Sequence, residues 1–222
     1  MNVDDVRARV IELRATIDAV ERVWTHRVAV VGVTKGFASD AIDAAVAAGC
    51  DAIGENYAQE LIDKRSTVER LGPEVQFIGQ LQRNKVRQLA GLVDVWCSLD
   101  RTSVIDEVAK RAPGARVMVQ VRTTDDPAKG GCSVDNVATL VDHATERGLR
   151  VEGLLTVGPT EGDSESARAG FRQVRALVEH LGLTECSMGM SGDLEVAGAE
   201  GSTQVRVGSA LFGSRPPRPT AT

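Results

Sequence analysis

The sequence has no patterned cysteines and no long apolar run, and both absences narrow the class of protein. The cysteines lie far apart and form neither a CxxC pair nor a cysteine and histidine pattern with metal-ligand spacing: Cys50, Cys97, Cys132 and Cys186. We therefore expect free thiols, as in a cytoplasmic protein. No apolar run approaches the roughly 20 residues of a membrane span, and the first residues mix acids and bases, unlike a signal peptide.

Basic residues are not in excess either. The formal net charge is −5, and no cluster of Lys and Arg stands out, which argues against a nucleic-acid-binding surface. The three histidines do not cluster in sequence, so we expect surface or structural roles and no metal site. With 222 residues, 42% of them hydrophobic, the chain is long enough for one large core, and a single domain is the simplest count. The lack of a long exposed apolar pattern favours a monomer.

The most informative stretch is Val28 to Lys35, which reads VAVVGVTK. A continuous run of this kind is typical of a strand covered on both faces, as in a parallel sheet, and it places Lys35 where the strand leaves the core. One interpretation is a lysine that extends its amine to solvent. The other is a partly desolvated amine that can form a Schiff base with a carbonyl compound.

Helical and strand-like segments alternate along the whole chain. An amphipathic helix comes first, because apolar residues recur at intervals of three and four: Val3, Val6, Val10, Leu13, Ile17, Val20 and Trp24. We expect one helix over Tyr57 to Leu71, ended by Gly72 and Pro73. Seven strands follow the first one: Asp51 to Gly54, Val75 to Gly79, Val93 to Ser98, Arg116 to Val121, Val151 to Thr156, Glu185 to Met188 and Gln204 to Val207.

Eight strands separated by helices predict an α/β fold with a parallel sheet. Eight units favour a single closed (β/α)8 barrel of the TIM type, here with an extra N-terminal helix, over an open doubly wound sheet. We expect the barrel domain to cover residues 1–213. Residues 214–222 have little apolar content and are expected to form a disordered tail.

In a barrel of this kind the residues after each strand share one face, where barrel enzymes place their sites. The loops after the last two predicted strands are rich in Gly and Ser, which suits a phosphate because backbone N–H groups and hydroxyls can both donate to it. Together with Lys35, this pattern indicates a ligand that carries a phosphate and an aldehyde. Pyridoxal phosphate is one candidate and the substrate of a sugar-phosphate aldolase is the other.

Motifs along nearly the whole chain resemble those of the pyridoxal phosphate homeostasis protein family, single-domain barrels similar to the N-terminal domain of alanine racemases. The matching segments are VTK ending at Lys35, GENYAQEL from Gly54, FIGQLQRNK from Phe77, QVRTTDDPAKGG from Gln120, GLLTV from Gly153, SMGMSGD from Ser187 and GSTQVRVGSALFGSR from Gly201. The resemblance implies a protein that holds pyridoxal 5'-phosphate (PLP) and hands it to apo-enzymes, with little or no catalysis.

The resemblance also implies roles for individual residues. Lys35 would carry PLP as an internal aldimine, and Asn56 would lie beside the cofactor. Arg206 would face the pyridine nitrogen. The other cofactor-binding residues, of which the last three would hold the phosphate, are Ser187, Ser191, Gly208 and Ser209. Since arginine only donates hydrogen bonds, Arg206 would leave that nitrogen unprotonated and make the ring a poor electron sink, which fits a carrier. The alternative for Arg206 is a strand-end arginine paired with a carboxylate.

Two positions depart from the family pattern, because many members have histidine at the position of Gln80 and serine at that of Arg83. Relatives also carry a lysine at the position of Lys129. That lysine could accept the cofactor transiently, but we expect a solvated loop lysine. We expect the same of three lysines in helical surroundings, Lys64, Lys85 and Lys110.

Three functions follow, ranked as a PLP carrier, an amino-acid racemase with weak activity and a Schiff-base aldolase. A racemase that uses two bases needs an acid or base on each face of its substrate, and in alanine racemases the second is a tyrosine from another domain. This chain has one tyrosine, Tyr57, and no second domain is expected. An aldolase commonly has its lysine on a later strand. Whether the protein is an enzyme stays open at this point, with the carrier favoured.

Overall fold

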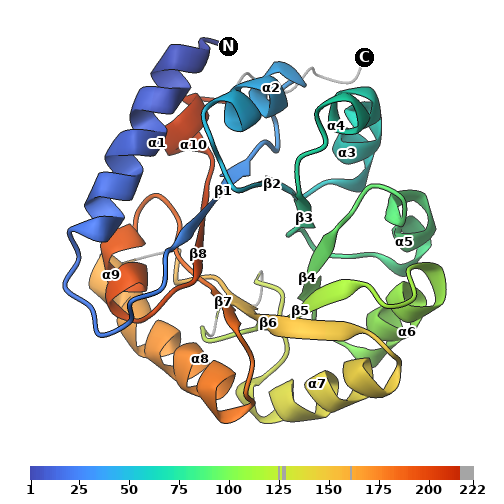
Figure 1. Ribbon diagram of the computed structural model, residues 1–222. Helices are drawn as coiled ribbons and strands as arrows, with labels where there is room; N and C mark the ends of the chain where they lie inside the picture. The colour runs from blue at the N-terminus through green and yellow to red at the C-terminus, as the bar shows by residue number, and fades with distance from the viewer. Residues whose placement is uncertain (125, 127–128, 161, 216–222) are drawn as a thin grey trace.

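Eight parallel strands close into a barrel in the computed structural model, which describes residues 1–124, 126, 129–160 and 162–215. Each strand pairs with the next, and β1 pairs with β8 to close the sheet. The helices form a ring outside it (Figure 1). The strands are β1 (Ala29–Val33), β2 (Ala52–Glu55), β3 (Val75–Phe77), β4 (Val95–Leu99), β5 (Arg116–Val121), β6 (Arg150–Thr156), β7 (Glu185–Ser187) and β8 (Gln204–Val207). The predicted barrel is confirmed, and the strand bounds differ from the prediction by one or two residues at most.

The outer ring follows the strands in chain order. Its α-helices are α1 (Val3–Asp18), α2 (Asp40–Ala47), α3 (Ala58–Asp63), α4 (Arg65–Leu71), α5 (Arg83–Leu89), α6 (Thr102–Arg111), α7 (Val137–Glu146), α8 (Arg168–His180), α9 (Leu194–Ala199) and α10 (Ser209–Phe212). Short 3-10 turns, η1 (Val134–Asn136) and η2 (Ser164–Ala167), lead into α7 and α8. The sequence did not predict α10. None of the described helices has both the length and the apolar character to cross a bilayer.

Helix α1 is the extra N-terminal helix, and it packs against α2, α9 and α10 (Figure 1). Four residues of the predicted apolar stripe are buried: Val6, Val10, Leu13 and Ile17. The helix ends at Asp18, so the extension of the stripe to Val20 and Trp24 was wrong. Trp24 instead packs beyond the helix, where its indole N–H donates to Glu179 over 3.3 Å and the Arg175 guanidinium lies 5.5 Å from its ring centre.

The single helix predicted over Tyr57 to Leu71 is divided at Lys64 into α3 and α4. Lys64 was also expected to be solvated, and this was wrong too, because only 5% of it is exposed. Its amine reaches inward to the Glu55 carboxylate, 2.5 Å away, and to the Thr34 carbonyl oxygen, 2.8 Å away. The division thus falls at the residue whose side chain turns inward.

The apolar core has two parts. The larger one fills the space between strands and helices and includes the α1 residues. The smaller one lies inside the barrel and consists of Val95, Cys97, Met118 and Leu155, with Ile78 and Val157 packed against it. The barrel interior is therefore filled, and a ligand can enter only at an end of the barrel. All four cysteines are free thiols, as expected.

Candidate functional site

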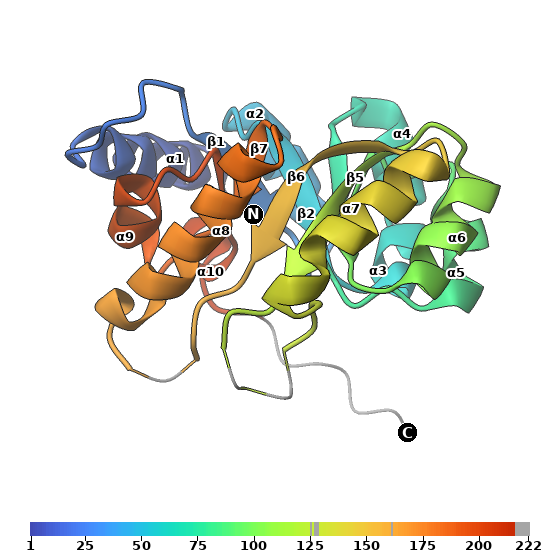
Figure 2. The same ribbon diagram turned by 90° about the horizontal axis from the view of Figure 1, so that it is seen from below.

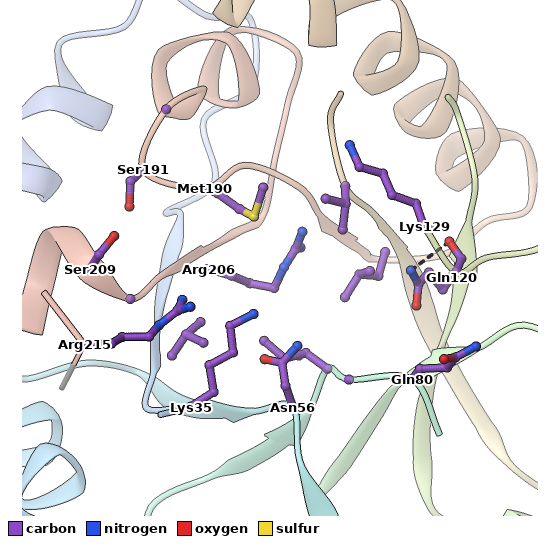
Figure 3. A pocket seen from close by; sticks show the side chains of 18 residues that line it. Lys35, Asn56, Gln80, Gln120, Lys129, Met190, Ser191, Arg206, Ser209 and Arg215 are labelled. Carbon is purple, nitrogen blue, oxygen red and sulfur yellow. Dashed lines mark hydrogen bonds between the residues drawn. The ribbon is translucent and has the colours of Figure 1, made fainter. Parts of the chain in front are cut away.

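A cavity of about 550 Å³ opens at the carboxyl ends of the strands, above the smaller core. The close-up in Figure 3 shows side chains from opposite sides of the barrel pointing into it. The polar and charged residues that line it are Lys35, Asn56, Gln80, Gln120, Lys129, Ser191, Arg206, Ser209 and Arg215. The loops at this end, seen at the bottom of Figure 2, are therefore the ones that form the site.

Lys35 stands two residues beyond β1 and points into this cavity (Figure 3). The pKa of its amine is lowered chiefly because the amine is half-buried, and then because Arg215 and Arg206 lie near it. Glu55 and Glu60 act in the opposite direction. Since only the neutral amine is nucleophilic, a lowered pKa increases the reactive fraction at neutral pH. The structure thus favours the desolvated amine over a lysine that extends to solvent.

Arg206 lies on β8, and its guanidinium is held in place by two contacts. One Nη donates to the Ser187 hydroxyl over 2.5 Å and the other to the Thr156 carbonyl over 2.7 Å. Burial lowers the pKa of Arg206 to about 10, so the group stays charged at neutral pH. Among the described residues Arg206 forms no ion pair, which removes the alternative of a strand-end arginine paired with a carboxylate. Ser187 contacts Arg206 and does not itself line the cavity.

The loops after β7 and β8 form one side of the cavity. Within the described part of the chain, the backbone N–H groups of Ser191, Gly192 and Ser209 donate no hydrogen bond. The hydroxyls of Ser191 and Ser209 have no partner there either. Gly208 completes this side, where an added Cβ would lie 3.2 Å from the Val33 carbonyl oxygen. A set of donors without acceptors is suited to a bound anion. The turn itself is fixed by Asp193, which accepts from the Met190 N–H over 2.5 Å.

Asn56 follows β2 and lies beside Lys35 in the cavity (Figure 3). Its Oδ1 is buried and has no partner among the described residues, so the side chain can still bind a ligand. Gly79 is needed next to it, because a Cβ there would overlap the Asn56 carbonyl. Of the two family departures, Gln80 lines the cavity, whereas Arg83 is exposed at the start of α5 and does not.

The opposite wall carries residues that the sequence treated as peripheral. Lys129 was expected to be solvated, but it is half-buried, lines the cavity and donates to the Gly158 carbonyl. Gln120, at the carboxyl end of β5, donates to the Gly130 carbonyl over 3.0 Å. Arg215 belongs to the predicted tail, yet it lines the cavity near Lys35. Residues 216–222 lie outside the described residues.

Sequence reasoning also missed the buried Glu55. Its carboxylate accepts from the Thr34 hydroxyl over 2.6 Å and from Lys64 over 2.5 Å, and burial leaves its pKa raised although both partners lower it. The GENY motif drew attention to Glu55 as a strand-end residue. No local pattern signalled that Lys64, in the following helical segment, would turn inward to meet it.

The fold and the site together define a class of protein. It is a closed parallel barrel with a lysine just beyond the first strand and an arginine on the last strand. The family model described as "Alanine racemase, N-terminal domain" matches residues 10–216. Similar proteins narrow this class to one family. A pyridoxal phosphate homeostasis protein of Aquifex aeolicus is 39% identical over 178 residues, covering 75% of this chain and 78% of the relative. One of Pseudomonas aeruginosa is 34% identical and covers 85% of each chain. The chain belongs to the pyridoxal phosphate homeostasis protein family.

A solved structure agrees with this placement. The structure of PipY from Synechococcus elongatus, described as having PLP bound, is 29% identical and superposes with a TM-score of 0.81. The match covers 94% of this chain and all of that one. Similarity in both sequence and shape thus extends over nearly the whole barrel.

Proposed function

We propose that this protein binds PLP as a Schiff base on Lys35 and serves in PLP homeostasis. The observation that carries the proposal is a single cavity that joins a half-buried amine of lowered pKa to a wall of unpaired hydrogen-bond donors. An aldehyde and a phosphate on one small molecule would use both features. The relatives named for PLP homeostasis and the PLP-bound PipY structure support the same ligand.

The residues of the cavity fit the groups of PLP. The bound cofactor would supply an aldehyde carbon for the Lys35 amine and an aromatic ring that can accept electrons. Ser191, Gly208 and Ser209 would hold the phosphate, and the unpaired Oδ1 of Asn56 would be available to a polar group beside the ring. Ser187 would act through Arg206, because its hydroxyl orients the guanidinium.

Arg206 supports a carrier over a catalyst. With a pKa of about 10, the guanidinium keeps its proton at neutral pH and offers only donors. Two of them are engaged by Ser187 and Thr156, so the group is fixed in one orientation. A donor that faces the ring nitrogen keeps this nitrogen unprotonated, and the ring is then a weak electron sink. Little or no turnover of amino acids follows.

The racemase remains the second candidate because Lys129 lines the same cavity as Lys35. A second base has to offer a free lone pair on the far face of the substrate. The contact of the Lys129 amine with the Gly158 carbonyl holds this amine at the loop after β6. Tyr57, the only tyrosine of the chain, does not line the cavity. Both placements favour the carrier, which in our proposal acts in the cytoplasm as a monomer and passes PLP to apo-enzymes.

Titration with two aldehydes tests the proposed ligand. We expect PLP to produce the Schiff-base absorption band at concentrations at which pyridoxal, which lacks the phosphate, does not. Loss of the phosphate contacts of the serine loops should weaken binding at least tenfold, since hydrogen bonds to a charged group are worth about 1.5 to 3 kcal/mol each. Equal affinity for both aldehydes would contradict the phosphate site. Racemisation of L-alanine at about 1 s⁻¹ or faster by the loaded protein would favour the racemase instead.

A further inference from the structure

Four residues around Lys35, three of them buried and Glu60 partly exposed, form a polar cluster that the proposed function does not use. We call Thr34, Glu55, Glu60 and Lys64 the Lys64 cluster. Thr34 and Glu55 are fully buried, and Lys64 is 5% exposed. Lys64 lies 2.5 Å from Glu55 and 3.9 Å from Glu60, so a single ammonium serves two carboxylates.

The cluster holds the backbone on both sides of Lys35. Before it, the Thr34 carbonyl accepts from Lys64 over 2.8 Å and the Thr34 hydroxyl donates to Glu55 over 2.6 Å. After it, the Gly36 N–H donates to Glu60 over 2.7 Å. The contacts come from Glu55 at the end of β2, Glu60 within α3 and Lys64 at the break between α3 and α4, so three segments fix the position from which the Lys35 side chain extends.

We propose that Lys64 is a positioning residue for Lys35. Lys64 fixes the backbone next to Lys35 and balances the charge of the Glu55 carboxylate, which would otherwise hold the Lys35 amine in its protonated form. The proposal rests on the proposed function only in taking Lys35 as the reactive amine. It assigns Lys64 no contact with the ligand, since Lys64 does not line the cavity.

The charges around Lys35 explain why this balance is needed. Arg206 on β8 and Arg215 beyond α10 favour its neutral form, whereas Glu55 and Glu60 favour its charged form. Lys64 is the cation that both carboxylates share. Glu55 depends on it most, because its Oε2 is buried without a partner and Oε1 accepts from Lys64 and Thr34. Without Lys64, which lowers the pKa of Glu55, burial would raise that pKa further, and the carboxylate that forms at alkaline pH would lie unbalanced beside the reactive amine.

Competitive labelling of the cofactor-free protein with trace acetic anhydride tests this directly. Mass spectrometry of the Lys35 peptide from about pH 6 to about pH 11 gives the midpoint at which its amine becomes reactive. The exposed Lys110 serves as the reference in the same sample. We expect the Lys35 midpoint to fall by about one pH unit in Glu55→Gln and to rise by about one unit in Lys64→Met, because each leaves one member of the pair unbalanced. The double variant should return close to the wild type.

The opposite signs of the two midpoint shifts distinguish the proposal from a purely structural role for Lys64, because a structural role would not move the two midpoints in opposite directions. If Lys64→Met does not fold, Glu55→Gln against the double variant still gives a difference of known sign, because the double variant removes both charges of the buried pair. Unchanged midpoints, or shifts in the same direction, would overturn the proposal. A wild type that forms no Schiff base with PLP would overturn the proposed function instead and leave these midpoints interpretable.

Discussion

Lys35 is a single residue whose place in the site lowers the stability of the fold. Its amine is half-buried beside Arg206 and Arg215, and both features disfavour the charged form. An unfolded chain would solvate the same amine freely. The residue best placed for reaction is therefore one that the fold accommodates at a cost.

We expect Lys35→Met to raise the free energy of unfolding of the cofactor-free protein at neutral pH. The pKa of Lys35 is lowered in the fold, so the unfolded chain binds more protons between the folded pKa and the ordinary value of 10.5, and stability rises with pH across that interval. The advantage of the variant should accordingly shrink as the pH approaches the ordinary lysine range. Urea unfolding at several pH values measures it.

Lys110→Met is the matched control for that comparison, because Lys110 lies exposed in the last turn of α6. Its free energy of unfolding should stay within about 0.5 kcal/mol of the wild type. A Lys35→Met variant less stable than this control at neutral pH would show that the amine is not strained in the fold.

At the scale of elements, α1 shows that a single apolar stripe docks a helix onto the barrel. We expect Leu13→Ala to lower the free energy of unfolding by about 2 to 4 kcal/mol, because Leu13 is only 6% exposed and its removal leaves a cavity beneath the helix. Ile11 lies on the outer face with 62% exposed, so Ile11→Ala should change stability by about 0.5 kcal/mol or less. Chemical denaturation compares the two; similar losses would mean that the stripe does not dock the helix.

The sequence predicted the elements that show a regular residue pattern and missed the features that depend on a contact with another element. Valine at every second position located β5 and β8 to the residue, because a period of two is typical of strands. The division at Lys64 gave no such signal, and the partner of Lys64 is the Glu55 carboxylate on the preceding strand. The four residues of α10 are likewise too few to show a helical period.

The site divides in the same way. Lys35 was found because it follows a clear strand, whereas Asn56 and Arg206 were found through the family resemblance; the structure brings all three into one cavity. Lys129 and Arg215 were assigned to solvent and to a tail, because loop and terminal residues carry no periodicity that shows which way they face. Ser187 was placed at the cofactor, whereas it reaches the cavity only through Arg206.

The whole molecule is a filled barrel with one reactive end. Its interior is closed by Val95, Cys97, Met118 and Leu155, which leaves the face at the carboxyl ends of the strands for chemistry. That face gathers Lys35, the donors of the serine loops and Arg206 within one cavity, and the family placement covers nearly all of the chain. In our proposal these parts serve a single ligand anchored on Lys35.

Borohydride reduction of the protein after incubation with PLP tests whether Lys35 anchors the ligand. We expect the Schiff-base absorption band to disappear on reduction and the peptide that contains Lys35 to gain the mass of one reduced PLP group. Lys35→Ala should show neither the band nor a modified peptide, while Lys110→Met should behave as the wild type. A modified peptide at Lys129 in place of Lys35, or a wild type that forms no band after reconstitution, would contradict the account.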